Sequence, residues 1–70
     1  MEKIEFELKG EFIQLIQLLN ACNLVENGSM AQQVVADGYV KRNGETEYRK
    51  RAKIQRGEII EFDGTQIKVI

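Results

Sequence analysis

Seven positively charged residues lie close together in the second half of this 70-residue chain. Lysine and arginine side chains on a surface can neutralise phosphate groups without desolvating a core. Only two carboxylates, Glu45 and Glu47, fall within the same stretch, so its formal charge is +5. The pattern favours binding to a polyanion, although a short basic run is also typical of a solvated surface. The seven cations are Lys41, Arg42, Arg49, Lys50, Arg51, Lys53 and Arg56.

The net charge of −1 conceals an uneven distribution of charge along the chain. Residues 1–37 contain two lysines and six carboxylates, which gives −4. Residues 38–70 contain eight cations and five carboxylates, which gives +3. One half of the chain is therefore acidic and the other basic, and we expect an anionic partner to contact the basic half.

Two tyrosines, Tyr39 and Tyr48, lie beside these cations. An aromatic ring next to a basic side chain can stack on an unpaired base or a ribose. The same rings commonly stabilise a hairpin through cross-strand packing. The sequence alone leaves both interpretations open.

Residues suited to catalysis or metal binding are scarce. Histidine is absent and Cys22 is the only cysteine, so neither an internal disulfide nor a Cys/His zinc site can form. Cys22 falls on the apolar face of a predicted helix, where we expect a small core residue. Glu58 and Glu61 fall in a predicted turn and on the wet face of a predicted strand, which is typical of solvated carboxylates. We therefore expect no catalytic residue, no metal, no cofactor and no small-molecule substrate.

The stretch Asn27–Gly44 contains a helix start, a helix end and a tight turn. Asn27 or Ser29 can cap the first turn of a helix with a side-chain oxygen, and Gly38 suits a left-handed helix end. These signals predict a helix of two to three turns. The dipeptide Asn43-Gly44 is preferred in a type I′ turn, where both central residues have positive φ. The expected buried stripe of the helix is Met30, Ala31, Val34 and Val35.

Two further elements are predicted before this stretch. Apolar and charged residues alternate over residues 3–8, which indicates a strand with one buried face. From Phe12 to Cys22, apolar residues recur at spacings of three and four, which indicates an amphipathic helix. Leu24 and Val25 are then expected to pack back on the core.

After the Asn43-Gly44 turn, Glu45–Tyr48 is expected to pair antiparallel with Tyr39–Arg42. The segment Arg49–Lys53 carries too much charge for a core strand and is predicted to be an exposed loop. Ile54 would anchor this loop in the core.

A second hairpin is predicted at Asp63-Gly64, joining residues 59–62 to residues 66–69. Its inner face would consist of Ile60, Phe62, Ile67 and Val69. The expected fold is α+β, with a leading strand, two short packed helices and then a small antiparallel sheet of hairpins, all in one domain over residues 1–70. No apolar run could span a bilayer and no secretory signal begins the chain, so we expect a cytoplasmic protein without membrane contact. We also expect a monomer.

Several segments, in this order, resemble the S-four RNA-binding domain, also known as the alpha-L motif and named after a ribosomal small-subunit protein. The most specific are the hairpin Gly-x-Val-x-x-Asn-Gly at residues 38–44 and the turn Gly-Glu-Ile-Ile at residues 57–60. The chain looks like the stand-alone bacterial version, without a catalytic domain. The resemblance covers nearly the whole chain, in the segments Leu15–Leu19, Asn27–Ala31, Asp37–Glu45, Arg49–Ile54 and Arg56–Phe62.

The resemblance implies a non-catalytic module that binds structured ribosomal or transfer RNA through its two helices and hairpin. Family members often carry a basic residue where this chain has Gln32, so the helix side of the surface is expected to contribute polar contacts in place of charge. A protein-interaction adaptor that keeps the same fold is the alternative function. Carried over by position, the residues facing RNA would be Asn27, Gly28, Ser29, Gln32, Lys41, Arg42, Arg49, Lys50, Arg51 and Lys53.

Overall fold

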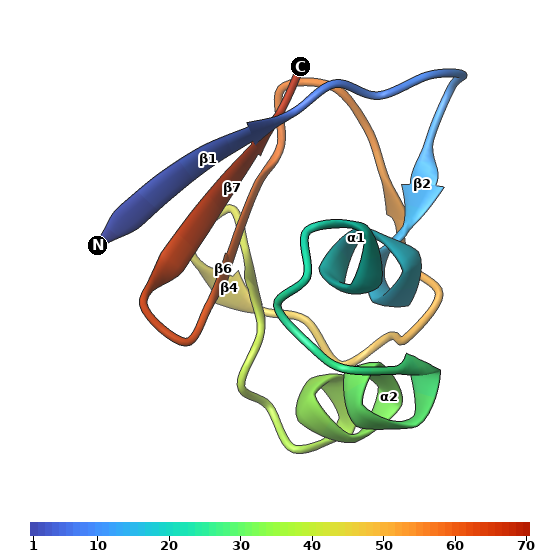
Figure 1. Ribbon diagram of the computed structural model, residues 1–70, viewed down its shortest axis with the longest axis vertical. Coiled ribbons are helices and arrows are strands. Elements are labelled where there is room, and N and C mark those ends of the chain that lie inside the picture. The colour runs from blue at the N-terminus through green and yellow to red at the C-terminus, as the bar shows by residue number, and fades with distance from the viewer.

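A computed structural model describes residues 1–70 and contains two helices and seven strands. In Figure 1 the helices lie together on one side of the main sheet. This arrangement confirms the α+β fold expected from the sequence. The elements are β1 (Glu2–Phe6), β2 (Ile13–Gln14), α1 (Leu15–Ala21), α2 (Gly28–Ala36), β3 (Lys41–Arg42), β4 (Glu45–Thr46), β5 (Lys53–Ile54), β6 (Ile59–Phe62) and β7 (Thr65–Val69).

The main sheet has the strand order β1-β7-β6-β3-β4. Both predicted hairpins are present, since β3 pairs antiparallel with β4 and β6 pairs antiparallel with β7. The leading strand lies parallel to β7, with Glu2 opposite Thr65 and Phe6 opposite Val69. It ends two residues earlier than predicted, but Leu8 stays buried and donates its N–H to the Ile70 carbonyl at 2.8 Å.

The prediction of a helix beginning at Phe12 is wrong, because α1 begins at Leu15. Ile13 and Gln14 instead form β2 and pair antiparallel with Ile54 and Lys53 of β5. The helical spacing of the apolar residues extends to Phe12 and Ile13, but the backbone of Ile13 and Gln14 pairs with β5 and does not continue the helix. Lys53 is for the same reason part of a short strand and not of the loop to which the sequence assigned it.

The same ladder continues into the first turn of α1. The Leu15 N–H donates to the Ala52 carbonyl at 2.9 Å, and the Ile16 N–H donates to the Lys50 carbonyl at 3.2 Å. The first N–H groups of a helix have no partner within the helix. Carbonyl groups of the segment 50–52 supply these partners, so this segment is fixed against the start of α1.

Helix α2 begins and ends where the sequence predicts. The Asn27 side-chain oxygen accepts a hydrogen bond from the Met30 N–H at 2.8 Å, and Gly38 has a φ of +81°. Ala31 and Val35 are fully buried, one turn apart on the same face. Met30 is exposed, contrary to the prediction, because it lies one position off the face that packs on the core.

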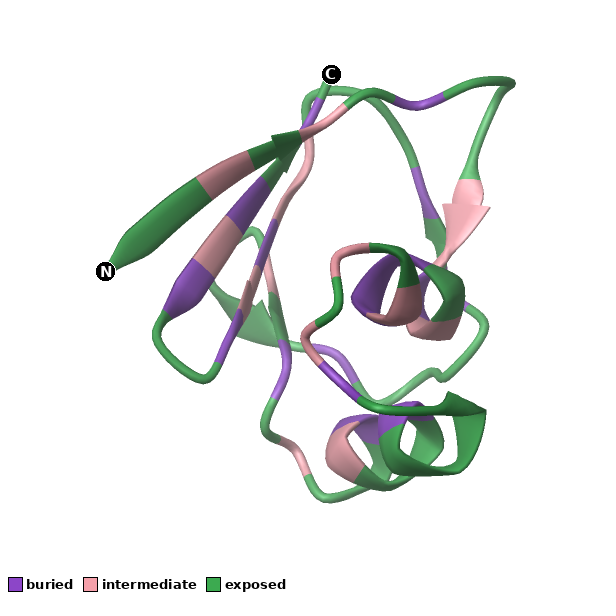
Figure 2. Cartoon of the chain, viewed as in Figure 1, coloured by how far each residue is buried: buried purple, intermediate pink, exposed green.

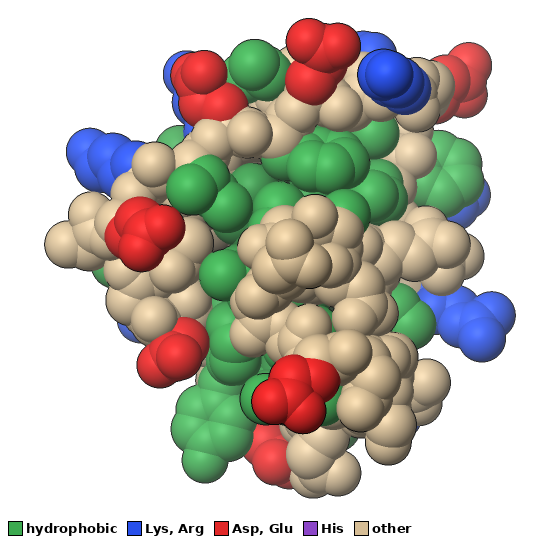
Figure 3. All heavy atoms as spheres, viewed as in Figure 1, with side chains coloured by type: hydrophobic (Ala, Val, Ile, Leu, Met, Phe, Trp, Pro, Cys, Tyr) green, Lys and Arg blue, Asp and Glu red, His purple; other side chains and the backbone are tan.

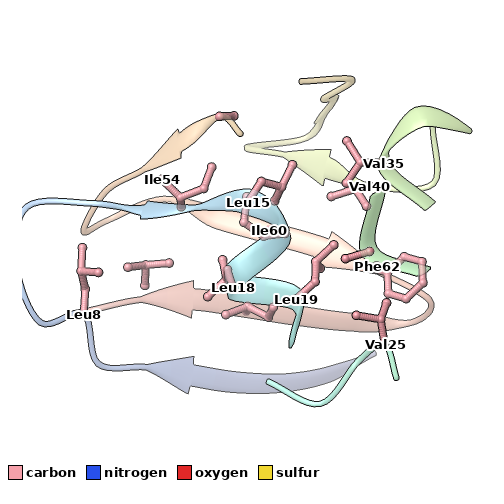
Figure 4. Close-up of a cluster of buried hydrophobic side chains, with 14 residues drawn as sticks. Leu8, Leu15, Leu18, Leu19, Val25, Val35, Val40, Ile54, Ile60 and Phe62 are labelled. Atoms are coloured by element: carbon pink, nitrogen blue, oxygen red, sulfur yellow. The ribbon is translucent and has the colours of Figure 1, made fainter. Parts of the chain in front are cut away.

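Fourteen apolar residues form one core between the helices and the sheet (Figure 4). Leu15, Leu18 and Leu19 of α1 are fully buried, as is the predicted anchor Ile54. The predicted inner face of the β6–β7 hairpin is confirmed, since all four of its residues are buried. In Figure 2 the buried segments lie along the strands and the inner faces of both helices. Cys22 is half-buried against this core, and its burial raises the pKa of the thiol.

Candidate nucleic-acid interface

The turn between β3 and β4 is held rigidly at the edge of the basic surface. Asn43 and Gly44 have φ values of +51° and +87°, as a type I′ turn requires. The Asn43 side-chain oxygen accepts a hydrogen bond from the Ile59 N–H at 2.9 Å, and the Asn43 N–H donates to the Ile59 carbonyl at 2.8 Å. The turn is therefore fastened to the start of β6.

Arg42, in the strand that precedes the turn, uses its charge inside the protein. Its Nε and Nη2 donate to the two carboxylate oxygens of Glu58 at 2.6 and 3.1 Å. Its Nη1 donates to Glu47 at 3.2 Å, and Nη2 also donates to the Lys53 carbonyl at 3.1 Å. The hydrogen bond to Glu58 is the main cause of a raised pKa for Arg42. A bidentate guanidinium–carboxylate pair is a strong contact, so Arg42 joins β3, β5 and the turn before β6.

Glu47 pairs with a second arginine, Arg49. Its carboxylate accepts hydrogen bonds from Arg49 Nε at 3.1 Å, from Arg49 Nη2 at 3.0 Å and from the Arg49 N–H at 3.1 Å. The Arg49 side chain lowers the pKa of Glu47 to about 2, even though burial acts in the opposite direction. Only 11% of the Glu47 side chain is exposed, whereas 74% of the Arg49 side chain is exposed.

Glu58 is not the solvated carboxylate that the sequence suggested. It is half-buried, and besides Arg42 it accepts hydrogen bonds from the Gln55 N–H at 2.6 Å and from Asn43 Nδ2 at 3.3 Å. Burial raises the pKa of Glu58, but the hydrogen bonds, first of all from Arg42, outweigh it and the pKa is lowered. We call Arg42, Glu47, Arg49 and Glu58 the arginine corner. Its two guanidinium groups face two carboxylates, so the corner is electrically neutral.

Four of the remaining five cations of the basic run have neither a carboxylate partner nor a side-chain hydrogen bond. All four residues are exposed. The ammonium nitrogen of Lys53 lies 5.0 Å from the centre of the Phe12 ring, within the range of a cation–π contact. We call these residues the free cations: Lys41, Lys50, Arg51 and Lys53.

Arg56, which the sequence placed in the basic run, serves another segment. Its Nη1 and Nη2 donate to the carbonyl groups of Gly10 and Leu8 at 2.8 and 2.6 Å. These bonds hold the connection between β1 and β2 against the turn before β6. Arg56 therefore joins two segments of the protein through carbonyl groups and has no carboxylate partner.

The helix side of the predicted surface is neutral. Gly28, Ser29 and Gln32 are exposed in the first two turns of α2, next to the cap Asn27. Gln32 has no hydrogen-bond partner, whereas Gln33 Nε2 donates to both carboxylate oxygens of Asp37 at 3.0 and 2.9 Å. In Figure 3 the face over the two helices is mostly uncharged, with both basic and acidic side chains around it.

The segment between β4 and β5 connects the basic surface to both helices. Its backbone bonds to the start of α1, as described above, and the Tyr48 ring lies against Gly38 directly after α2. The structure therefore fixes residues 48–53 beside both helices (Figure 1).

Comparison with known families identifies this arrangement. A family model described as the S4 domain, the S-four family that the sequence resembles, matches residues 6–70. The chain belongs to the S4 domain family.

Similar S4 proteins include YbcJ of Escherichia coli (strain K12), which is 36% identical over 62 residues, 89% of each chain. YbcJ of Shigella flexneri is equally similar, with 36% identity over the same length. The solution structure of E. coli YbcJ matches this chain with a TM-score of 0.73, over 94% of this chain and 85% of that one. That structure is described as revealing an αL motif involved in RNA binding.

Two residues of this S4 domain that shape the basic surface were missed by sequence reasoning. Glu47 and Glu58 look like ordinary surface carboxylates in the sequence, and their partners lie elsewhere in the chain. In the folded protein Arg42 lies between Glu45 of β4 and Ile60 of β6, because β3 pairs with both strands. The sequence does not reveal the pairing of β3 with β6, so it gave no signal that Arg42 would meet Glu47 and Glu58.

The structure reports two further facts that bear on function. Neither helix has the length and apolar character needed to cross a bilayer. No three side chains of the metal-binding types cysteine, aspartate and glutamate come together.

Proposed function

We propose that this S4 domain binds structured RNA, of the ribosomal or transfer class, as a non-catalytic protein of the cytoplasm. Residues 1–70 would act as one domain and as a monomer. The observation that carries the proposal is the group of free cations. Four exposed positive side chains without carboxylate partners, three of them in residues 50–53, provide charge that no acidic group in the protein neutralises.

The rigidity of this surface supports the same function. The backbone of residues 50–52 is bonded to the start of α1, and the arginine corner fixes the neighbouring strands. Cations on such a fixed backbone could hold phosphates in a defined position and so orient a nucleic acid without reading its sequence. The involvement of the αL motif of YbcJ in RNA binding is consistent with the proposal.

The proposed contact surface combines charge and polar groups. The free cations and Arg49, whose side chain is largely exposed, would contact phosphates. The exposed start of α2 would add neutral contacts through Asn27, Gly28, Ser29 and Gln32. Arg42 would act indirectly, because its guanidinium is already held by Glu58 and Glu47 and orients the hairpin.

Sedimentation of the protein in a cell extract tests the proposal. We expect it to migrate with ribosomal particles or other RNA, and to leave these fractions after ribonuclease treatment. The double variant Lys50→Gln, Arg51→Gln should remain near the top of the gradient. A complex that resists ribonuclease and is unaffected by the double variant would instead establish the adaptor function.

A further inference from the structure

Two tyrosine side chains near the C-terminal end of α2 are largely exposed: Tyr39, shortly after α2, and Tyr48, shortly after β4. Tyr39 is 66% exposed and Tyr48 is 64% exposed, although the sheet residues beside them, Val40 and Glu47, are buried. Single exposed apolar residues are common on protein surfaces, but adjacent aromatic rings beside unpaired cations are typical of a binding site. Packing within the fold therefore covers only the smaller part of each tyrosine and leaves the rest available to a partner.

The backbone places both rings on one face of the hairpin. Lys41 lies opposite Thr46, and the Glu47 N–H donates to the Val40 carbonyl at 2.9 Å, so the antiparallel register continues beyond the assigned strands. In this register Tyr39 lies opposite Tyr48. Because successive residues of a strand point to opposite faces, both tyrosines share their face with the free cation Lys41.

The Tyr48 ring packs next to the backbone of Gly38. A Cβ atom at Gly38 would lie 3.1 Å from Tyr48 Cε1 and 3.3 Å from its hydroxyl oxygen. The absence of a side chain at residue 38 thus lets the outer part of the Tyr48 ring rest on the backbone after α2. The hydroxyl end of the ring thus lies next to the backbone at Gly38, while Tyr48 as a whole stays 64% exposed.

We propose that Tyr48, with Tyr39 beside it, is a stacking platform for one unpaired nucleobase. Such a base would lie on the exposed part of the Tyr48 ring, and its flanking phosphates would reach Lys41 and Lys50. This inference rests on the proposed RNA binding and specifies the ligand as RNA with an unpaired nucleotide next to a helix. All four bases have a flat aromatic face that can stack on tyrosine. The platform would therefore favour RNA with an unpaired base, whatever the identity of that base.

The experiment compares two RNA hairpins of equal length and charge. One has ordinary nucleotides in its loop, and the other has abasic nucleotides at the same positions. Since stacking of one base on an aromatic residue contributes about a 5- to 150-fold change in affinity, wild type should bind the first hairpin more tightly by a factor in this range. Tyr48→Leu should remove the preference without changing the salt dependence, and Tyr48→Phe should keep it.

Tyrosine fluorescence supplies a second measurement on folded protein. The chain has no tryptophan, so its emission comes from Tyr39 and Tyr48 alone. In the variant Tyr39→Phe, Tyr48 is the only emitter, and the hairpin with loop bases should quench it while the abasic hairpin should not. This readout decides the question even if Tyr48→Leu fails to fold.

The outcomes separate the platform from the proposed function. Equal affinity of wild type for the two hairpins, or an unchanged preference in Tyr48→Leu, overturns the platform and leaves RNA binding standing. Loss of the preference in Tyr48→Phe also overturns it, because the ring would then not be the contact. Failure of wild type to bind either hairpin overturns RNA binding itself, and the platform with it.

Discussion

The two arginines of the arginine corner and the free cations belong to the same basic run of the sequence but differ in the folded protein. Arg42 and Arg49 face Glu47 and Glu58, so their charges are balanced within the molecule. Lys50 and Arg51, one and two residues after Arg49, have no such partner. The arginine corner thus fixes the hairpin in the fold, and in the proposed function the free cations would supply most of the charge for a phosphate backbone. Four predictions test this division.

Removal of two free cations should have the largest effect on RNA binding. The double variant Lys50→Gln, Arg51→Gln should lower affinity by roughly 10- to 100-fold and make the slope of log K against log salt less steep by about 1.5 to 2. The slope changes because a protein that contacts fewer phosphates displaces fewer counterions from the RNA. Fluorescence anisotropy of a labelled hairpin RNA over a range of salt concentrations measures both quantities.

The matched control for this variant is Lys3→Gln, Lys68→Gln, which removes the same charge from β1 and β7. These lysines line a depression with Gln66 on another part of the surface. We expect less than a twofold change in affinity. An equal loss in both double variants would mean that RNA responds only to net charge and that the free cations have no special role.

Removal of the guanidinium from the arginine corner should mainly affect stability. Arg42→Ala leaves two carboxylates with one cation fewer and breaks four hydrogen bonds. Since this side chain is only 24% exposed, the free energy of unfolding should fall by about 2–3 kcal/mol. Urea unfolding followed by circular dichroism measures the change.

The neighbouring variant Lys41→Ala is the control for Arg42→Ala, because it removes a cation of the same strand that has no partner. Its unfolding free energy should change by less than about 0.5 kcal/mol. If Arg42→Ala were no more destabilising than Lys41→Ala, the arginine corner would be a surface contact without structural weight.

Acid should weaken the arginine corner in a defined pH range. The pKa of Glu47 is about 2 in the folded protein against an ordinary value of 4.5, so its ion pair stabilises the fold fully above pH 4.5 and is lost as the pH falls toward 2. Allowing for screening by solvent, the contribution should be about 1–2 kcal/mol. The unfolding free energy of wild type and Glu47→Gln, measured from pH 6 to pH 2.5, should differ at pH 6 and converge in acid. A difference that stays constant with pH would contradict this account.

The smallest effect is expected on the neutral helix side. Gln32→Ala removes one polar contact and should weaken RNA binding by about 1 kcal/mol, or fivefold, without changing the salt slope. Gln33→Ala is the control, since the Gln33 amide is already bonded to Asp37 within the protein and should matter less than twofold. A loss in Gln32→Ala as large as in the lysine and arginine variant would shift the main contact from the basic segment to α2.

The parts of the fold that were predictable depend on local residue chemistry. Asn43-Gly44 and Asp63-Gly64 both have positive φ values because these residue types accept them, and both dipeptides signalled a hairpin. Asn27 and Gly38 marked the ends of α2 for equally local reasons. Each signal lies within a few residues of the structure that it specifies.

The features that were not predictable depend on residues far apart in the sequence. Ile13 fits a helical pattern, but its pairing with Ile54 draws it into a strand. Arg42 is 16 residues from Glu58, and no local pattern indicates that they meet. The list of RNA-facing residues was therefore drawn from charge and resemblance alone, without a means of separating Arg42 from Lys41.

The pairing of β1 with β7 has a consequence for the order of folding. Its partners, from Glu2 with Thr65 to Phe6 with Val69, are all 63 residues apart in the chain. Closing so long a loop costs more entropy than forming the hairpins, whose strands are adjacent in sequence, so β1 should dock after them. On the ribosome β1 emerges before β7 and stays unpaired until β7 is made. The charges of Glu2, Lys3 and Glu5 discourage wrong strand pairing at this edge in the interval.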